Sequence, residues 1–211
     1  MMEITELSPY KGDTWRLELD GETEVYINAA VVEDHGLCEG MELDEDTLEE
    51  IRGADTLRKA KKRALYLLGV RQYCYNELYG KLRASYPEEI AHAAASYMKE
   101  SGYINDEEYA EKLAAYLIHT KHWGLRKARY EMLHRGLDGN LVEDALAEYD
   151  EDDIDEEITE LIERKYYGKI QDYDDRRRTI AALARRGYDY TAVKRCIEMI
   201  LEDRDEDESD E

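Results

Sequence analysis

The pattern of hydrophobic and polar residues changes character at about residue 54. In residues 15–19 and 24–27, apolar residues alternate with polar ones, which predicts two half-buried strands. Asp20 and Gly21 between these runs are typical of a tight hairpin turn. The sequence therefore predicts an antiparallel hairpin, and Ile4 and Leu7 are candidates for a third strand.

Two helical segments are expected beside this hairpin. Residues 28–33 have the length of one or two helical turns. Residues 44–52 carry Leu48 and Ile51 at helical spacing, behind Asp44 or Asp46 as a cap.

From residue 54 onward, apolar residues recur every three or four positions, which predicts amphipathic helices with one apolar face. Four positions resemble helix starts: Asn105 and Asn140, each followed by glutamate at the third place, Pro87 as a first helical residue, and Asp189. Helix should therefore dominate the fold.

The helical part also repeats itself. Residues 132–137 match residues 183–188 at an offset of 51, and the same offset carries Val142 onto Val193. A weaker third copy matches Leu82 with Leu133. Each copy has room for three helices and is too small to be stable alone, so we expect the copies to stack.

The predicted fold is mainly α: an elongated tandem array of three three-helix repeats with a small N-terminal β-hairpin module. The predicted parts are an acidic hairpin module, three helical repeats and a disordered acidic tail, at residues 1–53, 54–103, 104–150, 151–203 and 204–211. The tail is predicted because it is almost a single run of like charge.

Charge is strongly segregated along the chain. The formal net charge is −23, but residues 1–53, 143–163 and 198–211 alone carry −13, −12 and −8. Basic residues concentrate in residues 55–85, 119–135 and 174–195, which carry +6, +4 and +4. These bases either lie across the chain's own acidic segments or form a concave basic face for an anionic partner.

No motif for catalysis or cofactor binding is present. The sequence has no glycine-rich phosphate loop and no nucleophile elbow. His119 and His122 share a helix face but lack the H-E-x-x-H form of a zinc site. Cys38, Cys74 and Cys196 are widely spaced and are interpreted as reduced packing residues. We therefore expect a binding protein with no enzymatic activity, no cofactor and no metal.

The sequence also gives an expectation for location. No apolar stretch reaches the about 18 residues of a membrane span, and the first residues lack the layout of a signal peptide. The expected location is cytoplasmic.

Several short segments, in this order and spacing, resemble the RecX family. They are residues 63–68, Glu77-Leu78, Lys81-Leu82, residues 102–110, the turn at 124–127, and the paired elements 135–137 and 185–188. The resemblance covers about residues 54–201. The acidic N-terminal part, with residues 40–43, is similar to an extension found on some members.

The resemblance implies a regulator without catalytic residues that lies along the groove of a RecA filament on single-stranded DNA. Family members commonly limit filament growth, ATP hydrolysis and strand exchange, which implies a role in recombination and the SOS response. The match places four leucines on repeat-core positions: Leu78, Leu82, Leu133 and Leu183. It places Gly102, Gly136 and Gly187 at helix ends, where a left-handed backbone favours glycine.

Basic residues of the repeats are the candidate contacts with the filament: Arg58, Lys62, Arg126, Lys127, Arg129, Arg135, Arg185 and Arg186. The expected partners are the RecA filament and, mainly through it, single-stranded DNA, with the chain acting as a monomer and away from membranes. Two alternatives remain: a DNA-binding protein acting through its basic helices, and a non-enzymatic helical-repeat adaptor whose acidic stretches bind a basic partner.

Overall fold

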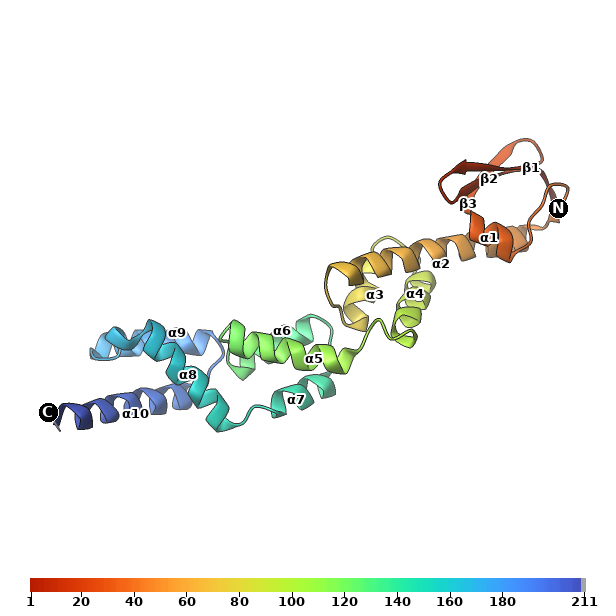
Figure 1. The fold of residues 1–211 in the computed structure, drawn as a ribbon. Coiled ribbons are helices and arrows are strands. Elements are labelled where there is room, and N and C mark those ends of the chain that lie inside the picture. Colours follow the sequence, from red (N-terminus) through yellow and green to blue (C-terminus); the bar gives the residue numbers. More distant parts are fainter. Residues whose placement is uncertain (210–211) are drawn as a thin grey trace. The chain divides into compact units, whose positions relative to one another are not determined.

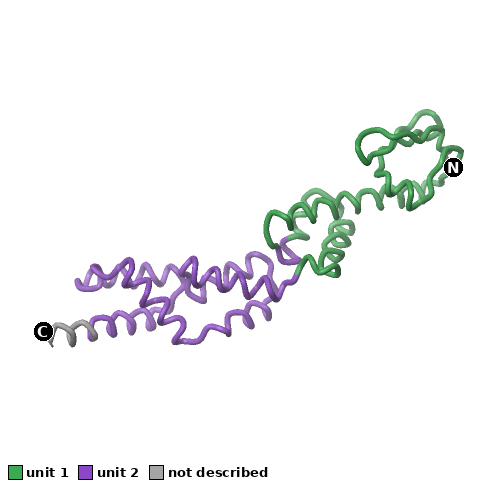
Figure 2. The backbone as a smooth tube through the Cα atoms, viewed as in Figure 1, with its two compact units in different colours: residues 1–72, 78–104 green, residues 73–77, 105–211 purple. Residues whose placement is uncertain are grey.

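The computed structural model describes the backbone of residues 1–209 and the side chains of residues 1–202. The chain divides into two compact units, which Figure 2 shows in different colours. Unit 1 comprises residues 1–72 and 78–104, and unit 2 comprises residues 73–77 together with the chain from residue 105 onward. The fold is mainly helical with a small antiparallel sheet at the N-terminus, as predicted (Figure 1). The predicted elongated shape and the five-part division stay predictions.

The sheet of unit 1 has the strand order β3-β2-β1-β4. Its strands are β1 (Met2–Lys11), β2 (Thr14–Leu19), β3 (Thr23–Asn28) and β4 (Glu42–Leu43), and neighbouring strands are antiparallel. Asp20 and Gly21 both have positive φ, at 53° and 71°, which suits the hairpin turn between β2 and β3. The predicted hairpin and the third strand through Ile4 and Leu7 are confirmed.

The buried face of the sheet packs on α1 (Ala29–Asp34) and on the first turns of α2 (Glu45–Val70). Asn28 caps α1, and of the two predicted candidates Asp44 caps α2. Asp55 is 3% exposed, accepts a hydrogen bond from the backbone N–H of Asn28 at 2.8 Å, and pairs with Lys59 Nζ at 2.6 Å. This buried carboxylate ties α2 to the end of β3. The helix runs through residues 53 and 54 without a break.

Small residues let α2 and α4 (Glu88–Glu100) pack closely in unit 1. Ala60 and Ala64 of α2 are fully buried, as are Ala91, Ala94 and Ala95 of α4. Leu78 and Leu82 of α3 (Tyr75–Arg83) are also fully buried, which confirms two of the predicted core positions. Pro87 precedes α4 as its cap and is not the first helical residue.

Unit 2 contains two sets of three helices, with a π-helical turn in the first set and a 3₁₀ turn in the second. Their bounds are α5 (Asp106–Ala115), η1 (Tyr116–Thr120), α6 (Leu125–His134), α7 (Gly139–Ala147), α8 (Glu151–Lys165), η2 (Tyr167–Lys169), α9 (Tyr173–Arg185) and α10 (Tyr190–Ser209). The predicted tail 204–211 begins within α10 and ends beyond the described residues, and its disorder stays a prediction.

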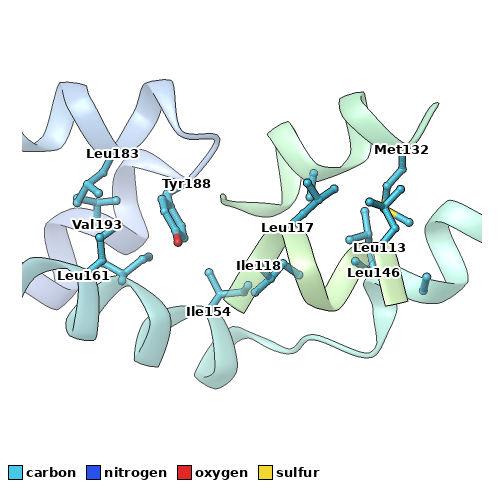
Figure 3. Close-up of a cluster of buried hydrophobic side chains, with 14 of the residues drawn as sticks. Leu113, Leu117, Ile118, Met132, Leu146, Ile154, Leu161, Leu183, Tyr188 and Val193 are labelled. Atoms are coloured by element: carbon cyan, nitrogen blue, oxygen red, sulfur yellow. The ribbon is translucent and has the colours of Figure 1, made fainter. Parts of the chain in front are cut away.

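One hydrophobic core runs through both helix sets of unit 2. In Figure 3, Leu113, Met132 and Leu146 cluster at one end and Leu161, Leu183 and Val193 at the other. Ile118, Ile154 and Tyr188 lie between these groups. The two helix sets therefore share buried surface, as expected for repeats that cannot hide enough apolar area alone.

Two sequence predictions in unit 2 are wrong by one or two residues. Leu133 is 45% exposed, and its neighbour Met132 takes the buried position. One residue corresponds to about 100° around a helix, so the small alignment error moved the prediction to the wrong face. Asp138, and not Asn140, caps α7 by accepting from the N–H of Asn140 at 2.9 Å. Asn105 and Asp189 do cap their helices.

The two helix sets meet through glycine backbones. Gly124 N donates to the carbonyl of Arg186 at 3.0 Å, and a Cβ on Gly124 would lie 2.3 Å from the carbonyl carbon of Gly187. Gly187 has a φ of +95°, and a Cβ there would lie 2.5 Å from Cβ of Lys127. No other residue type fits at either position without displacing the neighbouring chain.

A related contact occurs one repeat earlier in unit 2, where two side chains at a helix start bind the Arg-Gly turn. The Cys74 thiol donates to the carbonyl of Arg135 at 3.1 Å, and Asn76 Nδ2 donates to the carbonyl of Gly136 at 2.8 Å. Gly136 has a φ of +91°, and Gly102 has one of +75°. The predicted left-handed glycines are therefore confirmed, and two of them lie where a helix start contacts the next Arg-Gly turn.

We predict that Gly124→Ala destabilises the chain by about 1–3 kcal/mol, because the new methyl group must displace backbone atoms of Gly187. Gly139→Ala is the matched control, since Gly139 also lies at a helix start but has no neighbouring atom within 4 Å of the position that a Cβ would take. Urea denaturation followed by circular dichroism measures both variants. Equal free energies of unfolding for the two variants would contradict the close approach.

Candidate partner-binding surface

The eight basic residues predicted as contacts divide into two groups in the structure. Four are engaged within the chain, namely Lys127, Arg129, Arg135 and Arg186. The side chains of the other four have no hydrogen bond, ion pair or ring contact with the described residues: Arg58, Lys62, Arg126 and Arg185. All four of these are exposed. Sequence alone does not distinguish the two groups.

The side chains of Arg135 and Arg186 bind groups within the chain, Arg135 inside its own three-helix domain and Arg186 across to the preceding one. Arg135 Nε donates to Glu131 at 2.8 Å, and its Nη1 donates to the Tyr109 hydroxyl at 3.3 Å. Arg186 Nη1 donates to the carbonyls of Lys121 and His122, both at 3.3 Å. Both side chains belong to half-buried residues. Part of the hydrogen-bonding capacity of each guanidinium group is therefore used within the chain.

Lys127 and Arg129 make weaker contacts on the outside of α6. Lys127 Nζ lies 3.9 Å from the centroid of the Trp123 ring, a cation–π distance. Arg129 pairs with Glu143, and both side chains are about half exposed. Exposed pairs of this kind contribute little to stability, so a partner could displace them at low cost.

The glycine contact brings basic residues of two helices together. Figure 1 shows α6 and α9 end to end within unit 2, where the first turn of α6 meets the turn that follows α9. The residues that flank this meeting point form the basic junction, defined as Arg126, Lys127, Arg185 and Arg186. Arg126 and Arg185 supply its two unengaged charges. These two arginines are 59 positions apart in the sequence.

A separate basic face lies on the second half of α2 in unit 1. Residues 56–72 contain six basic residues and no acidic residue. Arg58 and Lys62 are one helical turn apart, and Tyr66, 63% exposed, lies one turn further. Arg63 lies 5.1 Å from the centroid of the Tyr66 ring. We call the surface of Arg58, Lys62, Arg63 and Tyr66 the α2 basic face.

A buried carboxylate between two histidines was missed by the sequence analysis. Nδ1 of His119 lies 2.6 Å from Glu157 Oε1, and Nδ1 of His122 lies 3.0 Å from Glu157 Oε2. Within the described part of the chain, no group of three side chains has the arrangement of a metal site. Glu157 could have been identified because it follows Ile154 by three residues and precedes Leu161 by four, on the apolar face of its helix.

The cysteines show no sign of an activated nucleophile. Cys74 and Cys196 are buried, and Cys38 is exposed. Burial raises the pKa of the Cys74 thiol, and burial next to the Asp155 carboxylate raises the pKa of Cys196 to about 11. A higher pKa lowers the thiolate fraction and so the reactivity. The interpretation as packing residues is consistent with this environment for Cys74 and Cys196, and it is wrong for Cys38, which is exposed.

Among the residues that the structure describes, no helix combines the length and the apolar content needed to cross a bilayer.

The arrangement described above defines a class of proteins built from tandem three-helix domains behind a small N-terminal sheet. Family models for the second and third three-helix domains of RecX match residues 105–146 and 151–197. The chain belongs to the RecX family.

Similar proteins cover nearly the whole chain. Regulatory protein RecX of Streptococcus gordonii is 23% identical over 211 residues, covering 100% of this chain and 81% of its own. Regulatory protein RecX of Clostridioides difficile is 23% identical over 203 residues, covering 94% of this chain and 95% of its own.

Solved structures share the fold. A crystal structure of regulatory protein RecX superposes with a TM-score of 0.70 at 21% identity, covering 92% of this chain and 98% of that chain. RecX from Lactobacillus salivarius gives a TM-score of 0.63 at 24% identity, covering 69% of this chain and 97% of its own.

We predict that only Cys38 reacts with a thiol reagent in the folded chain at pH 8. With a pKa of about 11, roughly one Cys196 thiol in a thousand is ionised at that pH. Mass spectrometry after brief iodoacetamide treatment should therefore find one modified cysteine, and all three after unfolding in urea. Rapid modification of Cys74 or Cys196 in the folded chain would contradict their buried positions.

Proposed function

We propose that this chain regulates RecA by binding the recombinase filament on single-stranded DNA and limiting its growth, ATP hydrolysis and strand exchange. It acts in recombination and the SOS response as a monomer without catalytic residues. Relatives that cover nearly the whole chain carry the name regulatory protein RecX, which supports the general role.

The observation that carries the proposal is the basic junction. Arg126 and Arg185 come from two three-helix domains, are exposed, and have no charged partner among the described residues. Charges at the edge of an interface steer association and fix orientation. Because both arginines sit beside a rigid backbone contact, binding would not require much reordering of the chain.

The overall charge favours filament protein over naked DNA as the primary partner. A net charge of −23 opposes adsorption of the whole chain to a polyanion. A basic junction of limited extent can still pair with acidic groups of a protein surface, because charges beyond about 8 Å are largely screened at physiological salt.

One observation favours a second candidate, direct binding of single-stranded DNA by the α2 basic face. Such sites combine positive charge along the backbone with aromatic rings on which bases stack. The α2 basic face has both, since Arg58 and Lys62 are unengaged and the Tyr66 ring is exposed. Lys61 also lies over the Tyr97 ring of α4, at 3.6 Å from its centroid.

The first prediction concerns the filament. Increasing amounts of the wild-type chain should lower RecA-dependent ATP hydrolysis on single-stranded DNA. Arg126→Glu with Arg185→Glu should raise the half-inhibitory concentration about tenfold or more, equivalent to about 1.4 kcal/mol of lost interaction. No effect of the wild-type chain up to one copy per recombinase would contradict the proposed function.

The matched control for this experiment is Arg164→Glu with Lys194→Glu. Both residues are exposed and lie outside the basic junction. The two substitutions change the net charge by the same amount as those in the junction. We expect the control to inhibit like the wild type. Equal loss of inhibition in both double variants would show that net charge, and not the junction, determines binding.

The second prediction separates DNA binding from filament binding. If the α2 basic face binds DNA, fluorescence anisotropy of a labelled oligothymidine should show binding at low salt that weakens steeply as salt increases. Arg58→Glu with Lys62→Glu should abolish this binding, and the junction variant should keep it. Absence of binding by the wild type at low salt would eliminate the second candidate.

A further inference from the structure

The contact between Glu157 and the two histidines joins two domains. His119 and His122 belong to the domain at residues 105–146, and Glu157 belongs to the domain at residues 151–197. Glu157 is 9% exposed and uses both carboxylate oxygens in this contact. The His122 side chain is 14% exposed, whereas that of His119 is 55% exposed. We call these three residues the His-Glu-His contact.

The backbone that carries the two histidines, residues 119–122, has an unusual conformation. His119 lies in the π-helical turn η1, and His122 has a φ of +50°, in the left-handed region that few non-glycine residues adopt. The N–H of Trp123 donates to the carbonyl of Leu117 at 3.0 Å, which closes this turn. Such conformations persist only when the surrounding structure holds them in place.

Two groups of the third domain hold this segment from different directions. Glu157 of α8 holds the two imidazoles, and Arg186, at the end of α9, holds the carbonyls of Lys121 and His122. The segment then continues through Gly124 directly into α6, whose first turn carries Arg126. The position of the segment therefore determines where the first turn of α6 lies relative to the end of α9.

We propose that Glu157 is a positioning residue that sets the alignment of Arg126 with Arg185 in the basic junction. This inference rests on the proposed function for its effect on RecA, but its structural part stands separately. The backbone contact from Gly124 to Arg186 fixes one point between the two domains. The two oriented hydrogen bonds to Glu157 supply a second point, and two separate points define an orientation that one point does not.

The chemistry of the contact allows a selective test. Glutamine keeps the shape of Glu157 and offers one oxygen acceptor and one NH₂ donor. The Nδ1 of a neutral imidazole carries a proton in one tautomer and a lone pair in the other, so it can donate to the oxygen or accept from the NH₂ group. Glu157→Gln can therefore keep both contacts, whereas Glu157→Leu keeps the volume and loses both. Glu156 is the matched control, since it is the neighbouring residue on α8, is exposed, and carries the same charge.

Trp123 provides a built-in reporter of the alignment. The chain has two tryptophans, Trp15 and Trp123, so Trp15→Phe leaves a single probe directly after His122. In this background, Glu157→Leu should shift the Trp123 emission maximum, and Glu157→Gln and Glu156→Leu should not. His119→Ala removes only the exposed imidazole and should give a smaller shift in the same direction, which covers the case in which Glu157→Leu does not fold.

The same variants are then compared in RecA-dependent ATP hydrolysis. We expect Glu157→Leu to raise the half-inhibitory concentration about tenfold, because it removes an oriented buried contact. We expect Glu157→Gln and Glu156→Leu to inhibit like the wild type. Folding is checked by circular dichroism. Rescue by glutamine distinguishes positioning by hydrogen bonds from a requirement for negative charge.

The outcomes are distinguishable. Unchanged Trp123 emission and unchanged inhibition in both Glu157→Leu and His119→Ala would overturn the positioning role, as would loss of inhibition in Glu157→Gln equal to that in Glu157→Leu. If the wild-type chain has no effect on RecA, the proposed function fails. In that case, an unshifted Trp123 emission in Glu157→Leu would still overturn the structural part.

Discussion

The close backbone approach between a helix start and an Arg-Gly turn is the constraint on which unit 2 depends. It occurs between Gly124 and Gly187, and in related form between Cys74–Asn76 and Arg135–Gly136. The turn must adopt a left-handed backbone to present its carbonyl, and glycine permits both that conformation and the short distance. The same contact that stacks the three-helix domains also brings the first turn of α6, which carries Arg126, to the turn that follows Arg185.

Features set by local chemistry could be predicted from the sequence. The hairpin at Asp20 and Gly21, the caps Asn105 and Asp189, and the left-handed glycines all depend on residues within a few positions of each other. The wrong predictions arose where two nearby residues are equally suited to the same buried or capping position. Met132 and Leu133 are equally apolar, and only the packing of α6 determines which one is buried.

The candidate surface was predictable as a set of helices but not as a set of side chains. Charge segregation pointed to α2, α6 and α9. It could not show that Arg135 and Arg186 bind groups inside the chain while Arg126 and Arg185 remain unengaged, because this depends on carbonyls and hydroxyls brought together by the fold. The His-Glu-His contact was missed because Glu157 is one of 12 acidic residues in the stretch 143–163. Its position on the apolar face of α8 indicates burial, but not that its partners are His119 and His122.

The central claim is that a RecX-family chain meets its filament through charges aligned by the stacking of its own domains. A cryo-EM reconstruction of this chain on a RecA filament with single-stranded DNA tests it most directly. The account predicts that the guanidinium groups of Arg126 and Arg185 both lie within hydrogen-bonding distance of acidic groups of the filament. A reconstruction in which the exposed faces of α6 and α9 point to solvent, and the filament contacts other parts of the chain, would contradict it.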